Sequence, residues 1–344
     1  MPFSLLYGLA VIVRNALYNK GWLKSTPFNM PLICIGNISV GGTGKSPMAE
    51  YLIRMLLPKY KMATVSRGYK RKTKGYVLAN EQTTALEIGD EPMQFYLKYP
   101  QVAVAVGEQR LEAIPQLLQD RPETQVILLD DAFQHRQIQA GLNIVLTAYH
   151  QPYWTDWFLP TGDLRDQRKS VRRAQMIVVT KCPENLAEAE RQKCLQAINP
   201  LPHQLVFFTT LHYGVPYRMF TGQPLPLHPG MEVLLVCGIA NPAPLKKYLE
   251  AHTAAYFEMR YTDHHIFTID DWKEIQKRFA AMEAPHKILL TTEKDAVRLI
   301  KFGSQVEDSP MYVLPVEHKF LFGQEAAFHQ QIHHYIAQYY PNPV

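Results

Sequence analysis

The sequence predicts an α/β protein: a mostly parallel sheet with helices on both faces, followed by a smaller α/β domain. The first observation is that short apolar runs, typical of buried parallel strands, alternate with helical stretches up to residue 179. The second is a change of texture after residue 203, where two extended segments, 204–213 and 217–220, precede a proline-rich stretch. The apolar runs of the first part are 32–35, 62–65, 102–106, 126–129, 144–146 and 176–179.

The chain has 344 residues, which is long enough for two domains. We interpret the two extended segments as a two-stranded connector between them. The expected divisions are an N-terminal helix at 1–24, the main α/β domain at 25–203, the connector at 204–229 and the smaller domain at 230–344. Within the smaller domain, strands are expected at 233–237, 255–258 and 288–291, and helices around 244–251, 269–282 and 327–339.

Composition excludes several function classes. Lys and Arg number 36 against 31 Asp and Glu, and the net charge of +5 is too weak to indicate nucleic-acid binding. The cysteines Cys34, Cys182, Cys194 and Cys237 form no C-x-x-C pair, which fits a reducing compartment and argues against a zinc site or disulfide framework. Basic residues do gather locally, at 67–74 and 165–173. Each cluster fits either a solvated loop or a surface for an anionic ligand or membrane.

The N-terminal segment is nearly all apolar from residue 3 to residue 13, and Arg14 follows. It is shorter than the ~20 residues that span a bilayer, and it lacks the basic start and cleavage site of a secretory signal. Tyr18, Lys20, Trp22 and Lys24 follow, and these types are enriched at membrane interfaces. The segment therefore fits either a core helix or a helix lying on a membrane. Its apolar stripe is Leu5, Leu6, Leu9, Ile12, Val13, Ala16 and Leu17.

The most informative segment is 35–47, which follows an apolar strand and precedes a helix-forming run at 48–57. Strand, glycine-rich turn, Lys-Ser and helix together are typical of a phosphate-binding P-loop. The glycines let backbone N–H groups approach phosphate, Lys45 reaches the outer phosphates, and Ser46 offers a hydroxyl to Mg²⁺. Ser39 stands where the common pattern has its first glycine. The predicted nucleotide-binding residues are Ser39, Val40, Gly41, Gly42, Thr43, Gly44, Lys45 and Ser46.

Two adjacent carboxylates, Asp130 and Asp131, end the apolar strand at 126–129. In a P-loop fold such a strand delivers an Asp beside the Mg²⁺ held by the loop hydroxyl. We therefore expect a metal site made by Ser46 with one or both aspartates. The strand at 176–179 ends in Thr180-Lys181-Cys182-Pro183, where a GTPase would carry Asn-Lys-x-Asp, so ATP is the expected nucleotide.

A transfer enzyme also needs a group that accepts the proton of the acceptor hydroxyl. The candidates are Asp90, within Gly89-Asp90-Glu91-Pro92, and the cluster Asp263-His264-His265. A carboxylate can orient an imidazole, and either group can act as the base. Residues of these types at loop ends also serve as helix caps, so spacing alone leaves both roles open.

At this point several stretches resemble the tetraacyldisaccharide 4′-kinase family, the lipid A 4′-kinases. They occur in the family's order and cover nearly the whole chain. Small departures are Ala132, where glycine is usual, Ser46, where threonine is usual, and Asp163, where proline or a small residue is common. The matching stretches are 36–47, Ser66-Arg67-Gly68-Tyr69, 89–92, Asp130-Asp131-Ala132-Phe133-Gln134-His135, 159–165, Asp263-His264 and 291–295.

The resemblance implies ATP- and Mg²⁺-dependent phosphorylation of the 4′-hydroxyl of a tetraacylated glucosamine disaccharide 1-phosphate. It implies that the N-terminal helix attaches the protein to the cytoplasmic face of the bacterial inner membrane, as a peripheral or monotopic protein. The implied partner is the lipid disaccharide, with neither nucleic acid nor an obligate protein partner. The fold implied is a P-loop NTPase-type sheet.

Residue by residue, the resemblance implies that Lys45 contacts phosphate and that Asp90 deprotonates the sugar hydroxyl with support from His264. Because His264 lies beyond the expected connector and Asp90 before it, we expect the site to lie in an interdomain cleft that closes on substrate. The residues that the resemblance implies for acceptor binding are Arg110, Arg165, Gln134 and His135.

Two other functions fit the P-loop alone. A soluble kinase or ligase acting on a small polar metabolite would keep the loop and Asp130-Asp131, but would pack the apolar N-terminal stripe into its core. A P-loop ATPase or GTPase switch would hydrolyse nucleotide without an acceptor, and Thr180-Lys181-Cys182-Pro183 argues against its GTP form.

Overall fold

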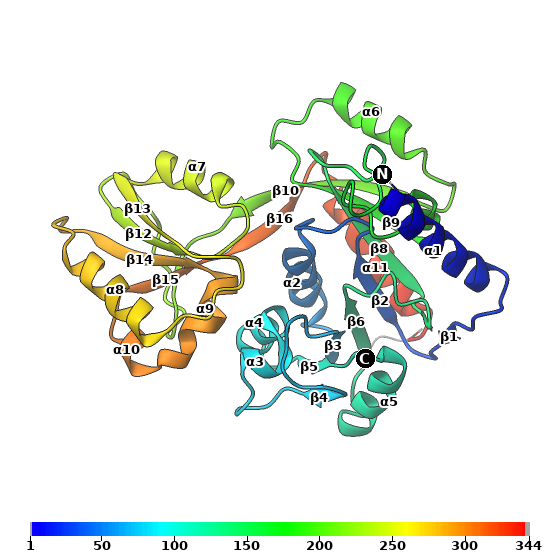
Figure 1. The fold of residues 1–344 in the computed structure, drawn as a ribbon, viewed down its shortest axis with the longest axis horizontal. Helices are drawn as coiled ribbons and strands as arrows, with labels where there is room; N and C mark the ends of the chain where they lie inside the picture. Colours follow the sequence, from blue (N-terminus) through cyan, green and yellow to red (C-terminus); the bar gives the residue numbers. More distant parts are fainter. Residues whose placement is uncertain (1, 341–344) are drawn as a thin grey trace. The chain divides into compact units, whose positions relative to one another are not determined.

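The computed structural model describes residues 2–340. By their contacts these residues form two compact units. Unit 1 comprises Met1–Leu211 with His318–Val344, and unit 2 comprises His212–Glu317. Each unit is built around its own mainly parallel sheet, so the α/β class predicted from the sequence is confirmed (Figure 1).

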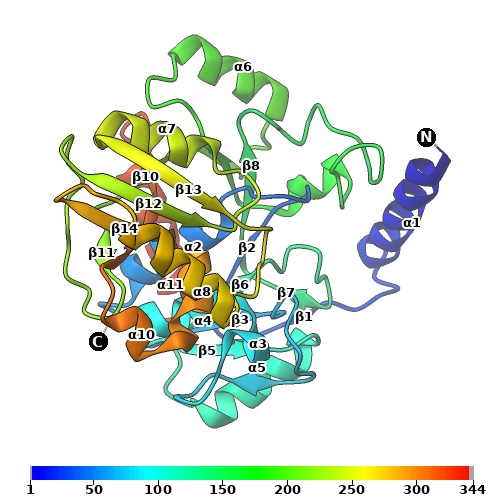
Figure 2. The same cartoon turned by 60° about the vertical axis from the view of Figure 1, so that its left-hand side comes forward.

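Unit 1 contains a nine-stranded sheet in the order β16-β10-β9-β8-β2-β6-β3-β5-β4, with helices on both faces (Figures 1 and 2). The strand pairings from β10 to β5 are all parallel, and β4 is antiparallel to β5. The strands are β2 (Leu32–Gly36), β3 (Met62–Ser66), β4 (Val77–Leu78), β5 (Ala103–Val106), β6 (Val126–Asp130), β8 (Leu142–Ala148), β9 (Met176–Thr180), β10 (Leu205–Tyr213) and β16 (Val316–Phe320); β1 (Thr26–Pro27) and β7 (Ile138–Gln139) form a separate parallel pair.

The central strands are buried on both faces, which explains their continuous apolar sequences. On one face, alternate residues of β2 and β6, such as Leu32 and Leu129, pack with Ile114 and Leu117 of α5. Helix α2 packs against β2 and β6. The helices of unit 1 are α1 (Pro2–Asn19), α2 (Lys45–Leu56), α3 (Ala85–Ile88), α4 (Asp90–Lys98), α5 (Arg110–Asp120), α6 (Glu188–Ile198) and α11 (Glu325–Ala337), with a 3₁₀ helix at Arg168–Arg173.

Helix α1 lies at the edge of unit 1 and packs with its polar side inward (Figures 1 and 2). Asn15 is only 1% exposed, and its Nδ2 donates to Asp166 Oδ1 at 2.7 Å. Ser4 is also buried and donates to the carbonyl of Phe158 at 2.6 Å. In contrast, Phe3 and Leu5 are 73% and 74% exposed. The apolar stripe therefore lies on the surface, and the core-helix alternative is wrong.

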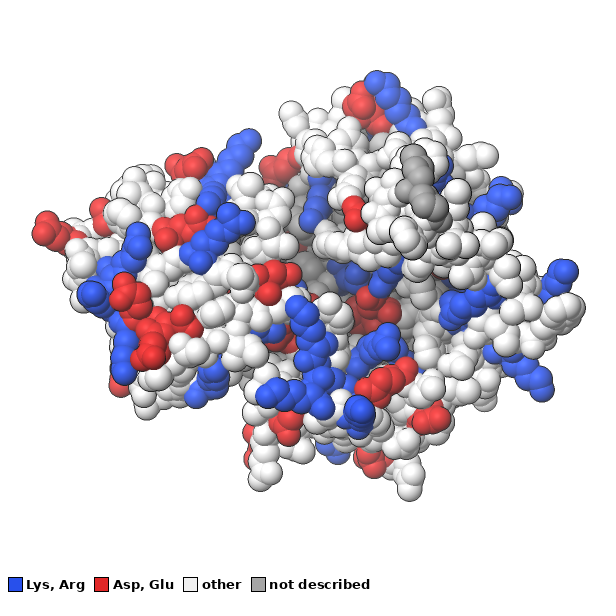
Figure 3. All heavy atoms as spheres, viewed as in Figure 1, with Lys and Arg blue, Asp and Glu red and all other residues white. Residues whose placement is uncertain are grey.

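The surface of α1 is mostly white in Figure 3, whereas elsewhere on this face basic and acidic side chains are interspersed. No helix among residues 2–340 has the length and apolar character needed to cross a bilayer.

Unit 2 has a five-stranded sheet in the order β11-β15-β14-β12-β13, parallel except for β11. Leu234 and Val236 of β12 face a cluster that includes Trp272 of α8, while Val233 and Leu235 face Leu245 of α7. Two-sided burial again explains the apolar strands. The elements are β11 (Tyr217–Arg218), β12 (Glu232–Cys237), β13 (Ala255–Arg260), β14 (Lys287–Thr292), β15 (Met311–Leu314), α7 (Ala243–His252), α8 (Ile269–Ala280), α9 (Glu293–Leu299) and α10 (Ser304–Glu307), with a 3₁₀ helix at Ile300–Phe302.

The structure corrects the expected connector. The segments at 204–213 and 217–220 do not pair with each other: β10 pairs with β9 and neighbours β16, whereas β11 pairs with β15 of unit 2. The chain passes between the units within β10 and again within β16.

The predicted C-terminal domain at 230–344 also differs from the structure, because the chain from His318 onward belongs to unit 1. There Phe328 of α11 packs edge-on against Phe207 of β10, with ring centroids 5.2 Å apart.

Candidate phosphoryl-transfer site

The sheet order brings the glycine-rich loop and the two predicted metal ligands to the same edge. β6 lies directly beside β2, and Asp130 at the end of β6 is in register with Ile35 near the end of β2. The loop 37–44 leaves β2 at this edge and leads into α2. Carboxyl ends of parallel strands are where α/β sheets place ligands. Lys45 Nζ accordingly lies 3.7 Å from Asp131 Oδ1.

Gly44 begins α2 in a left-handed conformation, with φ of +85° and no side-chain cap. A β-carbon there would be disfavoured by this backbone geometry. The first N–H groups of α2 have no partners inside the helix, and together with the positive end of the helix dipole they favour an anion. The loop therefore has the backbone arrangement expected of a phosphate site.

Two side chains and one backbone hydrogen bond hold the loop in shape. Asn37 Nδ2 donates to Thr43 Oγ1 at 2.9 Å, Thr180 Oγ1 donates to the Thr43 carbonyl at 2.8 Å, and the Val40 N–H donates to the carbonyl of Asp163 at 2.7 Å. Thr180 belongs to the segment that a GTPase would use for base recognition. Here its hydroxyl anchors the loop instead.

Asp131 is the centre of a charge cluster. Arg165 donates to both of its oxygens, with Nη1–Oδ2 at 3.1 Å, and Lys45 approaches from the loop. Burial works to raise the pKa of Asp131, but Lys45 and Arg165 outweigh it and hold the pKa below its usual value. Burial lowers the pKa of Lys45, while the neighbouring aspartate charges act in the opposite direction. Asp131 is thus ionised and already paired.

Asp130 is in the opposite situation. It is 6% exposed, and its Oδ1 has no hydrogen-bond partner among the described residues. Burial, reinforced by the charge of Asp131, raises the pKa of Asp130 to about 7. An unsatisfied buried carboxylate is costly and needs a compensating cation.

The donor set fits Mg²⁺ bound together with a nucleotide. Residues 2–340 contain no group of three or more His, Cys, Asp or Glu side chains arranged to hold a metal. Mg²⁺ in phosphoryl-transfer sites, however, is usually held by one or two carboxylates plus phosphate oxygens and water. Asp130 and Asp131 would supply the carboxylates, and Ser46 would add a hydroxyl oxygen.

Asp90, the predicted base, begins α4 and is 5% exposed. The next residue, Glu91, acts electrostatically on both Asp130 and Lys45, raising the pKa of each. The start of α4 therefore faces the same cluster. Sequence reasoning named Glu91 only as part of a motif and gave it no role, although its position in the first helical turn beside Asp90 was a usable signal.

A second group of cations surrounds the carboxylates. Burial and then the charge of Arg67 lower the pKa of Arg110, while Asp131 and Asp130 raise it. Burial, followed by Arg110, Arg14 and Arg67, lowers the pKa of His135 to about 4, so this imidazole is neutral at physiological pH. The sequence placed Arg67 in a basic cluster and in a family-matching stretch, without a role of its own. In the structure its charge acts on Arg110.

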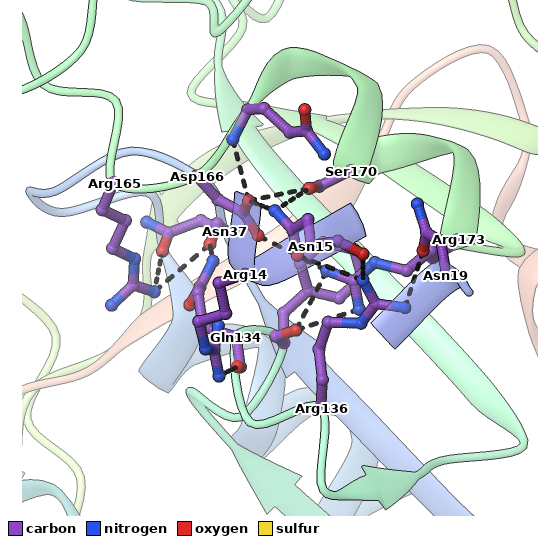
Figure 4. A network of polar contacts seen from close by, with 12 residues as sticks. Arg14, Asn15, Asn19, Asn37, Gln134, Arg136, Arg165, Asp166, Ser170 and Arg173 are labelled. Atoms are coloured by element: carbon purple, nitrogen blue, oxygen red, sulfur yellow. Dashed lines mark hydrogen bonds and ion pairs between the residues drawn. The ribbon is translucent and has the colours of Figure 1, made fainter. Parts of the chain in front are cut away.

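Arg165 and Gln134 connect this site to α1 (Figure 4). Arg165 also donates to the side chain and carbonyl of Asn37, and Gln134 Nε2 donates to the same carbonyl at 2.7 Å. From α1, Arg14 donates to the Gln134 carbonyl at 2.8 Å and Tyr7 Oη to the Arg165 carbonyl at 3.0 Å. The Gln134 amide is thus occupied by the loop, and its role in acceptor binding stays a prediction.

His264 lies in unit 2, in a left-handed conformation with φ of +63° between β13 and α8. Arg298 Nη2 lies 3.3 Å from its Nδ1, and Asp263 Oδ2 lies 3.8 Å from its Nε2. Because a guanidinium only donates, Nδ1 accepts and the proton is on Nε2. The catalytic role of His264 stays a prediction.

Fold and site together define the class. A parallel sheet, a glycine-rich loop with Lys-Ser at a helix start, and carboxylates on the adjacent strand are the parts of a P-loop phosphotransferase.

The particular family follows from comparison with known proteins. Residues 1–337 match the family model described as tetraacyldisaccharide-1-P 4′-kinase. The chain belongs to this family of lipid kinases.

Similar proteins span nearly the whole chain. A tetraacyldisaccharide 4′-kinase of Bacteroides thetaiotaomicron is 42% identical over 98% of this chain and 92% of its own length. One of Flavobacterium johnsoniae is 45% identical over 94% of this chain and 93% of its own. Among solved structures, LpxK from Aquifex aeolicus in complex with ATP has a TM-score of 0.75 at 27% identity, covering 97% of this chain and 98% of that one. The family resemblance noted in the sequence is confirmed.

Proposed function

We propose that this chain transfers the γ-phosphoryl group of ATP to the 4′-hydroxyl of a tetraacylated glucosamine disaccharide 1-phosphate, in lipid A biosynthesis. The observation that carries the proposal is the meeting of loop 37–44, Lys45 and the Asp130–Asp131 pair at one edge of the unit 1 sheet. Phosphoryl transfer depends mainly on positioning and charge neutralisation, and these groups supply both.

On the nucleotide side, the loop N–H groups and the start of α2 bind the ATP phosphates, and Lys45 contacts the transferred phosphoryl group. Lys45 is partly buried, with 18% of its side chain exposed, and lies beside Asp131, so it is oriented before the nucleotide arrives. Asp130, Asp131 and Ser46 would hold Mg²⁺, which supplies positive charge to the phosphate oxygens. Binding of a cation would satisfy the Asp130 oxygen that has no hydrogen-bond partner among residues 2–340.

On the acceptor side, Asp90 takes the proton of the 4′-hydroxyl. His264 is the second member of the catalytic pair implied by the family. Arg110, with Arg67 beside it, binds an acceptor oxyanion, and the low pKa of His135 leaves that residue as a neutral hydrogen-bonding partner. Arg165, which pairs with Asp131, is placed beside the carboxylates to contact the acceptor.

The lipid reaches this site from a membrane surface. We place α1 at the cytoplasmic face of the inner membrane, with its apolar stripe among the lipids. The exposed Phe3, Leu5 and Leu6 support this, because a soluble protein gains nothing by directing such residues to water while burying Asn15. Trp22, 73% exposed, extends the apolar surface past the helix end.

The test is phosphoryl transfer from γ-labelled ATP, with Mg²⁺, to a tetraacylated disaccharide 1-phosphate in detergent micelles. Labelled lipid made by the intact protein and not by Lys45→Ala supports the proposal. ATP hydrolysis without lipid labelling would contradict the proposed identity of the acceptor.

For the membrane step, Leu5→Ser with Leu9→Ser should reduce sedimentation with anionic vesicles while leaving activity in micelles intact. Leu97→Ser with Leu205→Ser, at exposed leucines elsewhere in unit 1, is the matched control.

A further inference from the structure

His318 is a buried histidine on β16 that no step of the proposed reaction uses. It is 4% exposed and lies directly beneath the phosphate-binding loop. Its Nε2 is 2.9 Å from the carbonyl oxygen of Gly44, and its Nδ1 is 2.9 Å from Thr209 Oγ1 on β10. Both partners are in unit 1, as is His318 itself. The two strands that carry these residues are also those through which the chain passes to and from unit 2.

The chemistry of the partners fixes the direction of both bonds. A carbonyl oxygen only accepts, so Nε2 carries a proton and donates to Gly44. Burial, with further contributions from Arg54 and Lys181, lowers the pKa of His318 to about 4, although the bond to Gly44 acts in the opposite direction. The ring is therefore neutral, Nδ1 is an acceptor, and Thr209 donates to it. A directed chain runs from the Thr209 hydroxyl through the ring to the loop.

The Gly44 carbonyl does not need this bond to be satisfied. It already accepts the N–H of Met48 at 3.1 Å, which is the first hydrogen bond of α2. The imidazole is thus a second donor on the residue that precedes Lys45. Packing is close as well, since a β-carbon on Gly44 would lie 3.1 Å from two ring atoms of His318. The ring therefore fixes both the position and the left-handed conformation of Gly44.

We propose that His318, held by Thr209, is a positioning residue that sets the Gly44 carbonyl and so aims Lys45 and the start of α2 at the ATP phosphates. This inference rests on the proposed role of the loop in ATP binding. His318 does not contact substrate. It acts through Gly44 and the first turn of α2, so its loss affects the ATP side of the reaction and leaves lipid binding unchanged.

The first experiment separates positioning from simple packing. His318→Leu keeps an apolar side chain of similar bulk but has no donor, whereas His318→Gln retains an amide N–H. We expect His318→Leu to raise the KM for ATP roughly threefold to tenfold, the factor for one neutral hydrogen bond, with the lipid KM unchanged and partial recovery in His318→Gln. Equal losses in both variants, or an unchanged ATP KM in folded His318→Leu, would overturn the inference.

A second pair of variants decides the matter if His318→Leu does not fold. Thr209→Val removes only the hydroxyl that orients the ring. Thr210→Val, at a buried neighbouring position whose side chain points to the other face of β10, is the control. The inference requires weaker ATP binding in Thr209→Val than in Thr210→Val. Equal affinities would contradict it.

One readout is independent of turnover. In ¹⁵N-histidine spectra, the signal lost in His318→Gln should be that of an Nε2–H tautomer that does not titrate between pH 6 and 8. An Nδ1–H tautomer would refute the bond to Gly44.

Lys45→Ala shows whether the proposed role of the loop in ATP binding is itself wrong. If that variant keeps full ATP affinity and transfer, the loop is not the ATP site. If it loses transfer while His318→Leu does not, only the role of His318 is wrong.

Discussion

Each of the two sheets has a buried aspartate at its carboxyl edge, and the two residues differ in their hydrogen bonding. In unit 2, Asp295 is 2% exposed, and its Oδ2 accepts hydrogen bonds from the Gly238 N–H at 3.0 Å and the Thr292 hydroxyl at 2.7 Å. In unit 1, Asp130 is buried to a similar degree, but its Oδ1 has no hydrogen-bond partner within the part of the chain that the structure describes. Burial raises the pKa of both carboxyl groups.

The difference separates a structural carboxylate from a functional one. Asp295 links the end of β12 to the start of α9, and its hydrogen bonds offset the desolvation cost of burying the carboxylate. In the unliganded protein no hydrogen bond to Oδ1 offsets the desolvation cost of burying Asp130. This is expected of a functional group that would be neutralised by a cation bound with the nucleotide. The comparison predicts that loss of Asp130 harms catalysis, whereas loss of Asp295 harms folding.

The largest expected effect is on turnover. Asp130→Asn should lower kcat by roughly 10²-fold or more, because a neutral amide cannot balance a divalent cation at the transferring phosphate. The measurement is lipid phosphorylation at saturating ATP and Mg²⁺. A variant with nearly normal kcat would remove Asp130 from the metal site.

Next in size is the proposed base. Asp90→Ala should lower kcat by roughly 10²–10⁴-fold, the usual contribution of general-base catalysis, with a smaller change in the KM for ATP. Steady-state kinetics with both substrates varied checks this. Turnover equal to that of the intact protein would exclude Asp90 from proton transfer.

Arg165 pairs with Asp131 and, in the proposed reaction, also contacts the acceptor. Replacing it should therefore change the binding of the lipid acceptor. Arg165→Ala should raise the lipid KM by roughly tenfold, as for one lost charge-assisted contact. Arg165→Lys should recover only part, because lysine cannot make the paired bonds that Arg165 makes to Asp131. An effect confined to ATP would contradict the acceptor assignment.

The structural half of the comparison predicts smaller changes, seen in stability. Asp295→Asn should lower the free energy of unfolding by about 1–3 kcal/mol, because at least one of its acceptor bonds is lost. Its kcat per folded molecule should stay close to normal. Chemical denaturation followed by kinetics of the folded fraction measures both, and a large fall in kcat would show that unit 2 uses this residue in catalysis.

Asp130 should show the opposite behaviour in the unliganded protein. Its pKa of about 7 in the folded protein lies above the ordinary aspartate value of 3.8, so its contribution to stability is full below pH 3.8 and is lost as the pH rises toward 7. Asp130→Asn should therefore melt higher than the intact protein at pH 8, by an amount worth at most about 4 kcal/mol, and the gap should close at low pH. Melting curves without nucleotide test this. A lower melting temperature at pH 8 would contradict it.

Local patterns predicted much of the fold and site. Residues 32–57 carry an apolar strand, clustered glycines, Lys-Ser and a helix in unbroken order, and every one of these features is local. Asp130 and Asp131 were found for the same reason, because they end a recognisable strand. Continuous apolar runs also located the central strands of both units, since two-sided burial produces such runs, but β15 and β16 were not predicted.

What the sequence missed depends on distant pairing. β16 and α11 return to unit 1 because β16 lies beside β10, which no local pattern shows. The orientation of α1 is set by the polar bonds of Ser4 and Asn15, so its apolar stripe alone could not reveal which side is buried. His318 is a single histidine in a short strand, and only the fold places it against Gly44.

The most direct test of the account is ATP binding by calorimetry, in Mg²⁺ and in EDTA, for the intact protein, Asp130→Asn and Asp295→Asn. We predict that Mg²⁺ tightens ATP binding in the intact protein and in Asp295→Asn, and that this gain is lost in Asp130→Asn. If Asp130→Asn keeps the full effect of Mg²⁺, the unpartnered carboxylate of unit 1 is not the cation site, and the contrast between the two aspartates fails.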